Sequence, residues 1–191
     1  MGEFYENEIM ELAEVMRSGG VVLIPTDSVW GIACDATNVD AVNRIFAIKN
    51  RTKDKPFVLL ASDIVMVKSF VDNIHPKIET LLLYHKRPLT VVYDNAKGLP
   101  LASVASDNSV AIRIPFDDYC NALITKLGKP IVATSANFSG QPFPGRFSQI
   151  DLDLIKLVDR VAHYRRNEQI NTEPSVIVRL NDDEELDFIR S

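Results

Sequence analysis

The sequence predicts an α/β fold in which helices flank a largely buried, mixed β-sheet. Segments in which apolar residues recur every three or four positions alternate along the chain with short, continuous apolar runs. No internal repeat or low-complexity linker interrupts this alternation. The length of 191 residues and the hydrophobic fraction of 46% suit one domain with a sizeable core, so we assign residues 1–191 to a single domain.

Helical periodicity begins near the N-terminus. Ile9, Leu12 and Met16 share one face of a predicted helix, which Gly19-Gly20 ends. Asn38 suits the N-cap of a second helix, because its side chain can accept hydrogen bonds from the first helical N–H groups. The predicted helices span residues 6–18, 38–49, 74–83, 118–127 and 148–157, with a short helix opened by Ser62-Asp63.

Short apolar runs bounded by Gly, Pro or polar residues indicate buried strands. The predicted strands span residues 21–24, 57–61, 89–93, 109–114, 130–133, 158–162, 175–180 and 186–189. Because the last three strands follow one another with no helix between them, we expect antiparallel as well as parallel pairing.

Charge and cysteine content exclude several classes of protein. The formal net charge is −5, so a nucleotide or RNA site has to come from local basic clusters. Cys34 and Cys120 lack the spacing of a zinc site or disulfide framework, which favours a reducing compartment. Residues 1–7 do not resemble a signal peptide, and no apolar run approaches the roughly 18 residues of a membrane helix. We therefore expect a cytoplasmic protein that does not bind a membrane.

Polar residues follow the first predicted strand directly. Thr26, Asp27 and Ser28 come after the run 21–24, and Gly31 follows them. Ligand crevices commonly lie where strands of an open α/β sheet end. The same residues also suit an ordinary β-turn, so this segment alone leaves both interpretations open.

Four cations lie within seven residues between a predicted helix and the next strand: Lys49, Arg51, Lys53 and Lys55. Cations at a helix C-terminus complement the helix dipole, which is a purely structural role. Lys and Arg also bind phosphates, Lys as a compact charge and Arg as a two-pronged donor. The segment therefore indicates either a phosphate site or a solvated face.

A third polar segment follows the strand near residue 131. Small hydroxyl and amide side chains at Thr134, Ser135 and Asn137 lead to Gly140. Such a loop can present N–H groups and short side chains to an anion or a sugar. An ordinary turn has the same composition.

Taken together and in this order, the three segments resemble the YrdC-like family of threonylcarbamoyl-AMP synthases. The resemblance rests on P-T-D-x-V-x-G at residues 25–31, K-x-R at 49–51 and S-A-N-x-S-G at 135–140. Further matches are Pro88-Leu89-Thr90, V-A-x-R-x-P at 110–115 and Pro174-Ser175. The resemblance covers roughly residues 8–190.

The resemblance implies a twisted, open sheet with a concave, basic face for substrates. We expect this chain to lack the extra C-terminal domain of longer relatives. The resemblance also implies a nucleotidyltransferase that converts L-threonine, bicarbonate and ATP into threonylcarbamoyl-AMP and pyrophosphate, with Mg²⁺ carried by ATP. The product would pass to a separate tRNA threonylcarbamoyl transferase for tRNA modification. RNA is a further possible ligand.

The same resemblance assigns roles to individual residues. The expected catalytic residues are Lys49 and Arg51, which with Lys55 would contact the ATP phosphates or the developing carbamate. Threonine and its carbamate would be held by Thr26, Ser28, Arg113, Ser135 and Ser175, with Arg113 suited to the carboxylate. The nucleotide would also contact Ser109, Asn137 and Arg190. No residue is expected to bind a metal directly.

The chain departs from the family pattern in several places, one of which is Arg87 before Pro88, where the family usually has Gly. Trp30 stands where Tyr is usual, and Val176 and Arg179 replace the Thr and Asp of the last motif. Residues 164–173 lack the glycines expected there. These departures leave two alternatives open: a non-enzymatic RNA-binding relative, and a paralogue of the same fold that acts on another carbamoyl or nucleotide substrate.

Overall fold

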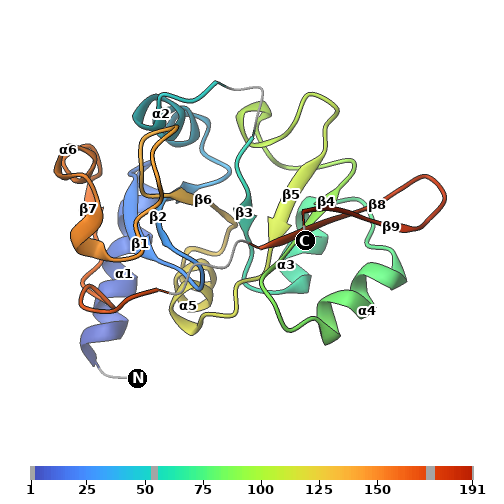
Figure 1. The fold of residues 1–191 in the computed structure, drawn as a ribbon, viewed down its shortest axis with the longest axis horizontal. Coiled ribbons are helices and arrows are strands. Elements are labelled where there is room, and N and C mark those ends of the chain that lie inside the picture. The colour runs from blue at the N-terminus through green and yellow to red at the C-terminus, as the bar shows by residue number, and fades with distance from the viewer. Residues whose placement is uncertain (1–2, 53–55, 171–174, 191) are drawn as a thin grey trace.

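The computed structural model describes residues 3–52, 56–170 and 175–190 (Figure 1). Its helices are α1 (Glu3–Arg17), α2 (Val39–Lys49), α3 (Ile64–Phe70), α4 (Pro76–Tyr84), α5 (Asp118–Leu127) and α6 (Leu152–Ile155). Its strands are β1 (Val22–Pro25), β2 (Trp30–Asp35), β3 (Leu59–Leu60), β4 (Leu89–Tyr93), β5 (Val110–Arg113), β6 (Ile131–Ser135), β7 (Arg160–Val161), β8 (Val176–Leu180) and β9 (Leu186–Arg190). Short 3₁₀ helices span Leu101–Ser103 and Phe147–Gln149.

The strands form one sheet in the described part of the chain, in the order β7-β1-β2-β6-β3-β5-β4-β8-β9. Pairing is mixed, as predicted: β1 and β2 are antiparallel, whereas β4 and β8 are parallel. The sheet is open, because β7 and β9 form its two edges. The α/β fold class predicted from the sequence is therefore confirmed.

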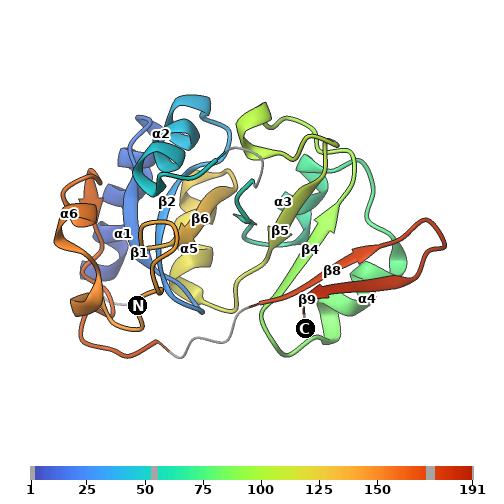
Figure 2. The same ribbon diagram turned by 45° about the horizontal axis from the view of Figure 1, so that its top comes forward.

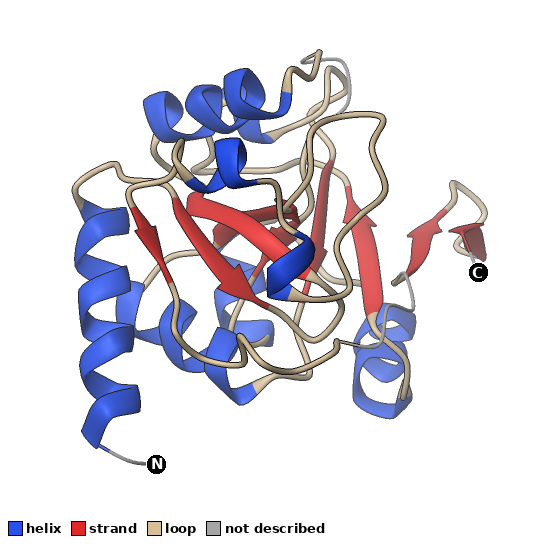
Figure 3. Ribbon diagram, turned by 60° about the vertical axis from the view of Figure 1, so that its left-hand side comes forward, coloured by secondary structure: helices blue, strands red, loops and turns tan. Residues whose placement is uncertain are grey.

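Helices cover both sides of the sheet. Around β1, β2 and β6, α2 lies on one side and α1 with α5 on the other (Figures 1 and 3). Figure 2 shows α3 and α4 in the other half of the molecule, next to β4, β8 and β9. None of the helices within the described ranges is long and apolar enough to cross a membrane.

The local sequence signals account for several helix boundaries. Asn38 caps α2, because its Oδ1 accepts the N–H groups of Asp40 and Ala41 at 3.1 and 3.0 Å. Gly128 ends α5 in the left-handed conformation with φ 77°, which glycine adopts without steric cost. The periodic residues Leu12 and Met16 of α1 are fully buried, so the helical pattern also identified part of the core.

The structure corrects several predicted elements. β2 was not predicted, although it is buried throughout and pairs with both β1 and β6. At Gly31 in this strand, an added Cβ would lie 3.3 Å from the carbonyl oxygen of Thr134, so glycine permits the close approach of β2 to β6.

Two more predicted elements are shorter or differently placed. The helix expected over 148–157 is divided into a 3₁₀ turn and α6, because the Asp151 side chain accepts the N–H of Asp153 and starts a new helix. The strand expected over 158–162 is only β7, which pairs with β1 at the edge of the sheet opposite β8 and β9.

Candidate active site

A cavity of about 560 Å³ extends across the sheet from the β1–β2 turn and β6 to β8 and β9. Three arginines line it, Arg51, Arg113 and Arg190, together with the hydroxyl groups of threonines and serines. None of the described lining residues is Asp or Glu. Three cations, with no carboxylate among the described lining residues, indicate a site for anions on a protein of net charge −5.

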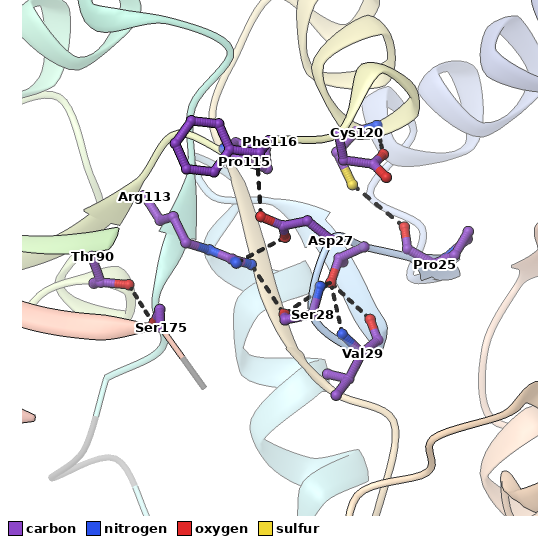
Figure 4. Close-up of polar contacts among 12 residues, drawn as sticks. Pro25, Asp27, Ser28, Val29, Thr90, Arg113, Pro115, Phe116, Cys120 and Ser175 are labelled. Carbon is purple, nitrogen blue, oxygen red and sulfur yellow. Dashed lines mark hydrogen bonds and ion pairs between the residues drawn. The ribbon is translucent and has the colours of Figure 1, made fainter. Parts of the chain in front are cut away.

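The β1–β2 turn is closed by the hydroxyl of Thr26. This oxygen accepts the N–H groups of Ser28 and Val29, each at 3.2 Å, and donates to the carbonyl oxygen of Val29 at 2.8 Å. The Ser28 hydroxyl also lies 3.1 Å from Thr26 Oγ1. Thr26 therefore shapes the turn, and the Ser28 side chain lies against Arg113 at the cavity wall (Figure 4).

Arg113 ends β5 with its guanidinium almost fully buried. Its Nη1 lies 2.8 Å from Asp27 Oδ1, and its Nη2 lies 3.5 Å from the Ser28 hydroxyl. The side chains of Arg113 and Asp27 are each 7% exposed. Strand alternation places Ala111 on the same face of β5, where it also lines the cavity.

Lys49 lies beneath the loop that follows β6. Its ammonium donates to the carbonyl oxygens of Ser135 and Asn137, both at 2.6 Å, and to Asn137 Oδ1 at 3.0 Å. The Ser139 N–H in turn donates to the Lys49 carbonyl oxygen at 3.1 Å. Burial, followed by the nearby Arg51 charge, lowers the pKa of Lys49 to about 8. Lys49 thus links the C-terminal end of α2 to the loop after β6 through hydrogen bonds.

Arg51 reaches the cavity wall two residues beyond Lys49. Its guanidinium carbon lies 4.9 Å from the centroid of the Phe57 ring, and Nη2 donates to the Pro56 carbonyl oxygen at 3.4 Å. Phe57 packs on Phe46 of α2, with ring centroids 4.3 Å apart. The aromatic contact orients the Arg51 side chain at the cavity.

Ser175 and Arg190 form the far wall. Arg190 donates from Nε to the Ser175 carbonyl oxygen at 2.9 Å and from Nη2 to its hydroxyl at 3.1 Å. Thr90, which is buried, lies 2.9 Å from the same hydroxyl through its Oγ1 (Figure 4). The last strand therefore completes a cavity that begins at the first hairpin.

The fold brings seven of the predicted site residues to the cavity wall: Thr26, Ser28, Arg51, Arg113, Ser135, Ser175 and Arg190. Three others lie outside the described lining. Lys49 and Asn137 belong to the loop network, in which Asn137 Oδ1 also accepts the Ser135 hydroxyl at 2.5 Å. Ser109 is buried just before β5, with its N–H donating to Asp107 at 3.0 Å. The predicted Lys55 lies outside the described residues.

Comparison of the sequence with protein-family models identifies the family of this chain. The model of the Sua5/YciO/YrdC family, described as "Telomere recombination", matches residues 14–191. The chain belongs to this family. The resemblance inferred from the sequence motifs is thereby confirmed.

Relatives of this Sua5/YciO/YrdC chain include two bacterial proteins named threonylcarbamoyl-AMP synthase. The protein of Coxiella burnetii (strain RSA 331 / Henzerling II) is 30% identical over 155 residues, which is 81% of each chain. The protein of Bacillus subtilis (strain 168) is 33% identical over 149 residues, which is 77% of this chain and 43% of that relative.

Solved structures share the fold. Sua5 of P. abyssi, complexed with L-threonine, superposes with a TM-score of 0.82 at 27% identity over 92% of this chain. The chain spans about half of that protein's length, 51%. YciO of E. coli superposes with a TM-score of 0.84 at 23% identity, over 97% of this chain and 89% of that one, and shows the fold alone.

Sequence reasoning missed the apolar part of the site in this family member. Phe57, Phe143 and Ile177 line the cavity beside the polar residues. Apolar residues of this kind carry no local signal, because the same residues form strands and cores throughout the chain. Asp27 was visible within the first motif, but its pairing with Arg113 depends on the approach of two distant segments.

Proposed function

We propose that this family member is an L-threonylcarbamoyladenylate synthase, a nucleotidyltransferase that converts L-threonine, bicarbonate and ATP into threonylcarbamoyl-AMP and pyrophosphate. The observation that carries the proposal is the cavity with three arginines and no carboxylate among its described lining residues. The names of the C. burnetii and B. subtilis relatives and the threonine complex of P. abyssi Sua5 support the same activity.

The proposed reaction has two stages. The threonine nitrogen attacks the carbon of bicarbonate, and loss of water leaves an N-carboxylate. An oxygen of this carboxylate then attacks the α-phosphorus of ATP, and the bond from that phosphorus to the bridging oxygen breaks to release pyrophosphate. Transfer at phosphorus depends mainly on positioning and charge neutralisation, which arginines and hydroxyl groups supply.

The positions of the lining residues support a separate role for each part of the cavity. Arg113 with Ser28 would hold the threonine carboxylate, and Ser135 would lie beside the carbamate. Arg51 would neutralise phosphate charge, and Arg190 with Ser175 would bound the nucleotide. Lys49 and Asn137 would order the loop that carries Ser135, and their direct contact with ATP stays a prediction.

Mg²⁺ would enter as part of the ATP substrate. In the described part of the chain, no group of three or more His, Cys, Asp or Glu side chains is arranged to hold a metal ion. We further propose that the product is delivered in the cytoplasm to a tRNA threonylcarbamoyl transferase that modifies adenosine in tRNA.

An RNA-binding role has weaker support. Three other arginines that lie close together in the sequence, Arg160, Arg165 and Arg166, interact with groups of the protein itself. Arg165 pairs with Asp117 at 2.8 Å, Arg160 pairs with Glu11 at 2.5 Å, and Arg166 donates to two backbone carbonyl oxygens. Because these cations are neutralised or bonded within the protein, they add little to an RNA-binding surface.

Pyrophosphate release tests the proposed function. We expect release from MgATP and bicarbonate that depends on L-threonine. Arg51→Ala should reduce the rate on the order of 100-fold, because it removes charge at the phosphates. Arg44→Ala is the matched control, since Arg44 pairs with Asp159 outside the described cavity lining and should retain activity. A folded wild-type protein without threonine-dependent release would contradict the proposal.

A further inference from the structure

Asp27 carries a buried carboxylate that contacts the cavity-lining Arg113 but is not itself one of the described lining residues. Its neighbours Thr26 and Ser28 both line the cavity, whereas Asp27 does not. Its Oδ1 lies 2.8 Å from Arg113 Nη1, and its Oδ2 accepts the Phe116 N–H at 3.1 Å (Figure 4). Asp27 therefore joins the β1–β2 turn both to the end of β5 and to the loop that follows it.

The turn that carries Asp27 is held by its own hydrogen bonds. Thr26 Oγ1 accepts two N–H groups of the turn and donates to the Val29 carbonyl oxygen. The Asp27 carboxylate is consequently presented from a fixed backbone. Arg113 reaches it from β5, which is hydrogen-bonded on both sides by β3 and β4. The backbones that carry Asp27 and Arg113 are thus both held by hydrogen bonds.

We propose that Asp27 is the positioning residue that orients Arg113 for the carboxylate of the amino-acid substrate. The inference rests on the proposed function, because it assigns to Arg113 the role of binding threonine. Asp27 forms an ion pair with Nη1 of Arg113, while Nη2 lies 3.5 Å from the hydroxyl of Ser28, a cavity-lining residue. An arginine binds a carboxylate well only when its planar donor groups are set in the correct orientation.

Asp27 has two opposing effects on anion binding. Its negative charge offsets the charge of Arg113 and by itself weakens the attraction for a carboxylate. Its contact also fixes the guanidinium orientation, which strengthens binding. Removal of the charge therefore raises threonine affinity if the first effect dominates and lowers it if the second does, so the sign of the change tests the proposal.

Asp27→Asn keeps the size of the side chain and an oxygen that can accept the Phe116 N–H. We expect L-threonine binding, measured by calorimetry without ATP, to weaken roughly tenfold or more, because small misplacements of a binding group are costly. In the pyrophosphate assay, the KM for threonine should rise more than the KM for ATP.

Asp35→Asn is the matched control. Asp35 is also a buried, ion-paired carboxylate, with Lys129 Nζ at 3.0 Å, but it lies outside the described cavity lining. Thermal unfolding of both variants checks that they are folded. We expect Asp35→Asn to bind threonine as the wild type does, because its charge does not orient Arg113.

The outcomes separate the inference from the proposed function. Unchanged or tighter threonine binding by folded Asp27→Asn, or no threonine binding by the wild type, would overturn the role of Asp27. Threonine binding that depends on Asp27, with no pyrophosphate release by the wild type, would support that role and contradict the synthase activity. Normal turnover of Asp27→Asn with an unchanged KM for threonine would support the synthase activity and contradict the role of Asp27.

Discussion

At the residue scale, Lys49 couples protonation to stability. Burial lowers the pKa of Lys49 to about 8 from the ordinary lysine value of 10.5, so between these pH values the unfolded chain binds the proton more fully than the folded protein does. Stability therefore rises with pH across this window. We expect the free energy of unfolding of the wild type, relative to Lys49→Met, to increase by up to about 3 kcal/mol from pH 8 to pH 10.5. Denaturant titration at each pH measures it. Lys156→Met is the control, because the Asp153 carboxylate raises the pKa of Lys156 and gives no such gain. A pH-independent difference for Lys49→Met would contradict the prediction.

At the element scale, hydrogen bonds from side chains fix both ends of α2. Its C-terminal residue Lys49 fastens the 135–139 loop, and its N-terminus is capped by Asn38. Asn38→Ala leaves two N–H groups without this acceptor and should lower the free energy of unfolding by about 1 kcal/mol. Asn38→Ser keeps a capping oxygen and should lose much less. Urea titration of the three proteins provides the measurement. Because the cap lies at the opposite end of α2 from Lys49, the pyrophosphate-release rate of folded Asn38→Ala should match that of the wild type. Equal stability of the Ala and Ser variants would show that the cap contributes nothing here.

At the scale of the whole molecule, one cavity is lined by segments from near the beginning and from the end of the described chain. The cavity is lined by the β1–β2 turn on one side and by Ile189 and Arg190 of β9 on the other. A ligand that contacts both sides and binds only the folded state stabilises it by mass action, by about 2.7 kcal/mol at 100 times its dissociation constant. We therefore expect MgATP to raise the melting temperature in a concentration-dependent way. Arg190→Lys should reduce the shift, because Lys cannot reproduce the two contacts of Arg190 with Ser175. An unchanged melting temperature at saturating MgATP would contradict nucleotide binding at this cavity.

The sequence by itself determined the α/β class, most of the helices and the motifs that supply the cavity. Helical spacing identified α1, and the capping residue Asn38 placed the start of α2, because these signals act within a few residues of one another. Motif resemblance identified Arg51 and Arg113, which line the cavity.

Only the tertiary structure decided how these parts meet. β2 escaped prediction because its formation depends on pairing with β1 and β6 rather than on a local pattern. The direction of a side chain depends on strand register and on neighbours distant in the sequence. For that reason Lys49 lies under the loop after β6, while Arg51 faces the cavity. The pairing of Asp27 with Arg113 has the same cause: the sheet brings the β1–β2 turn to the end of β5, and no spacing along the chain specifies that contact.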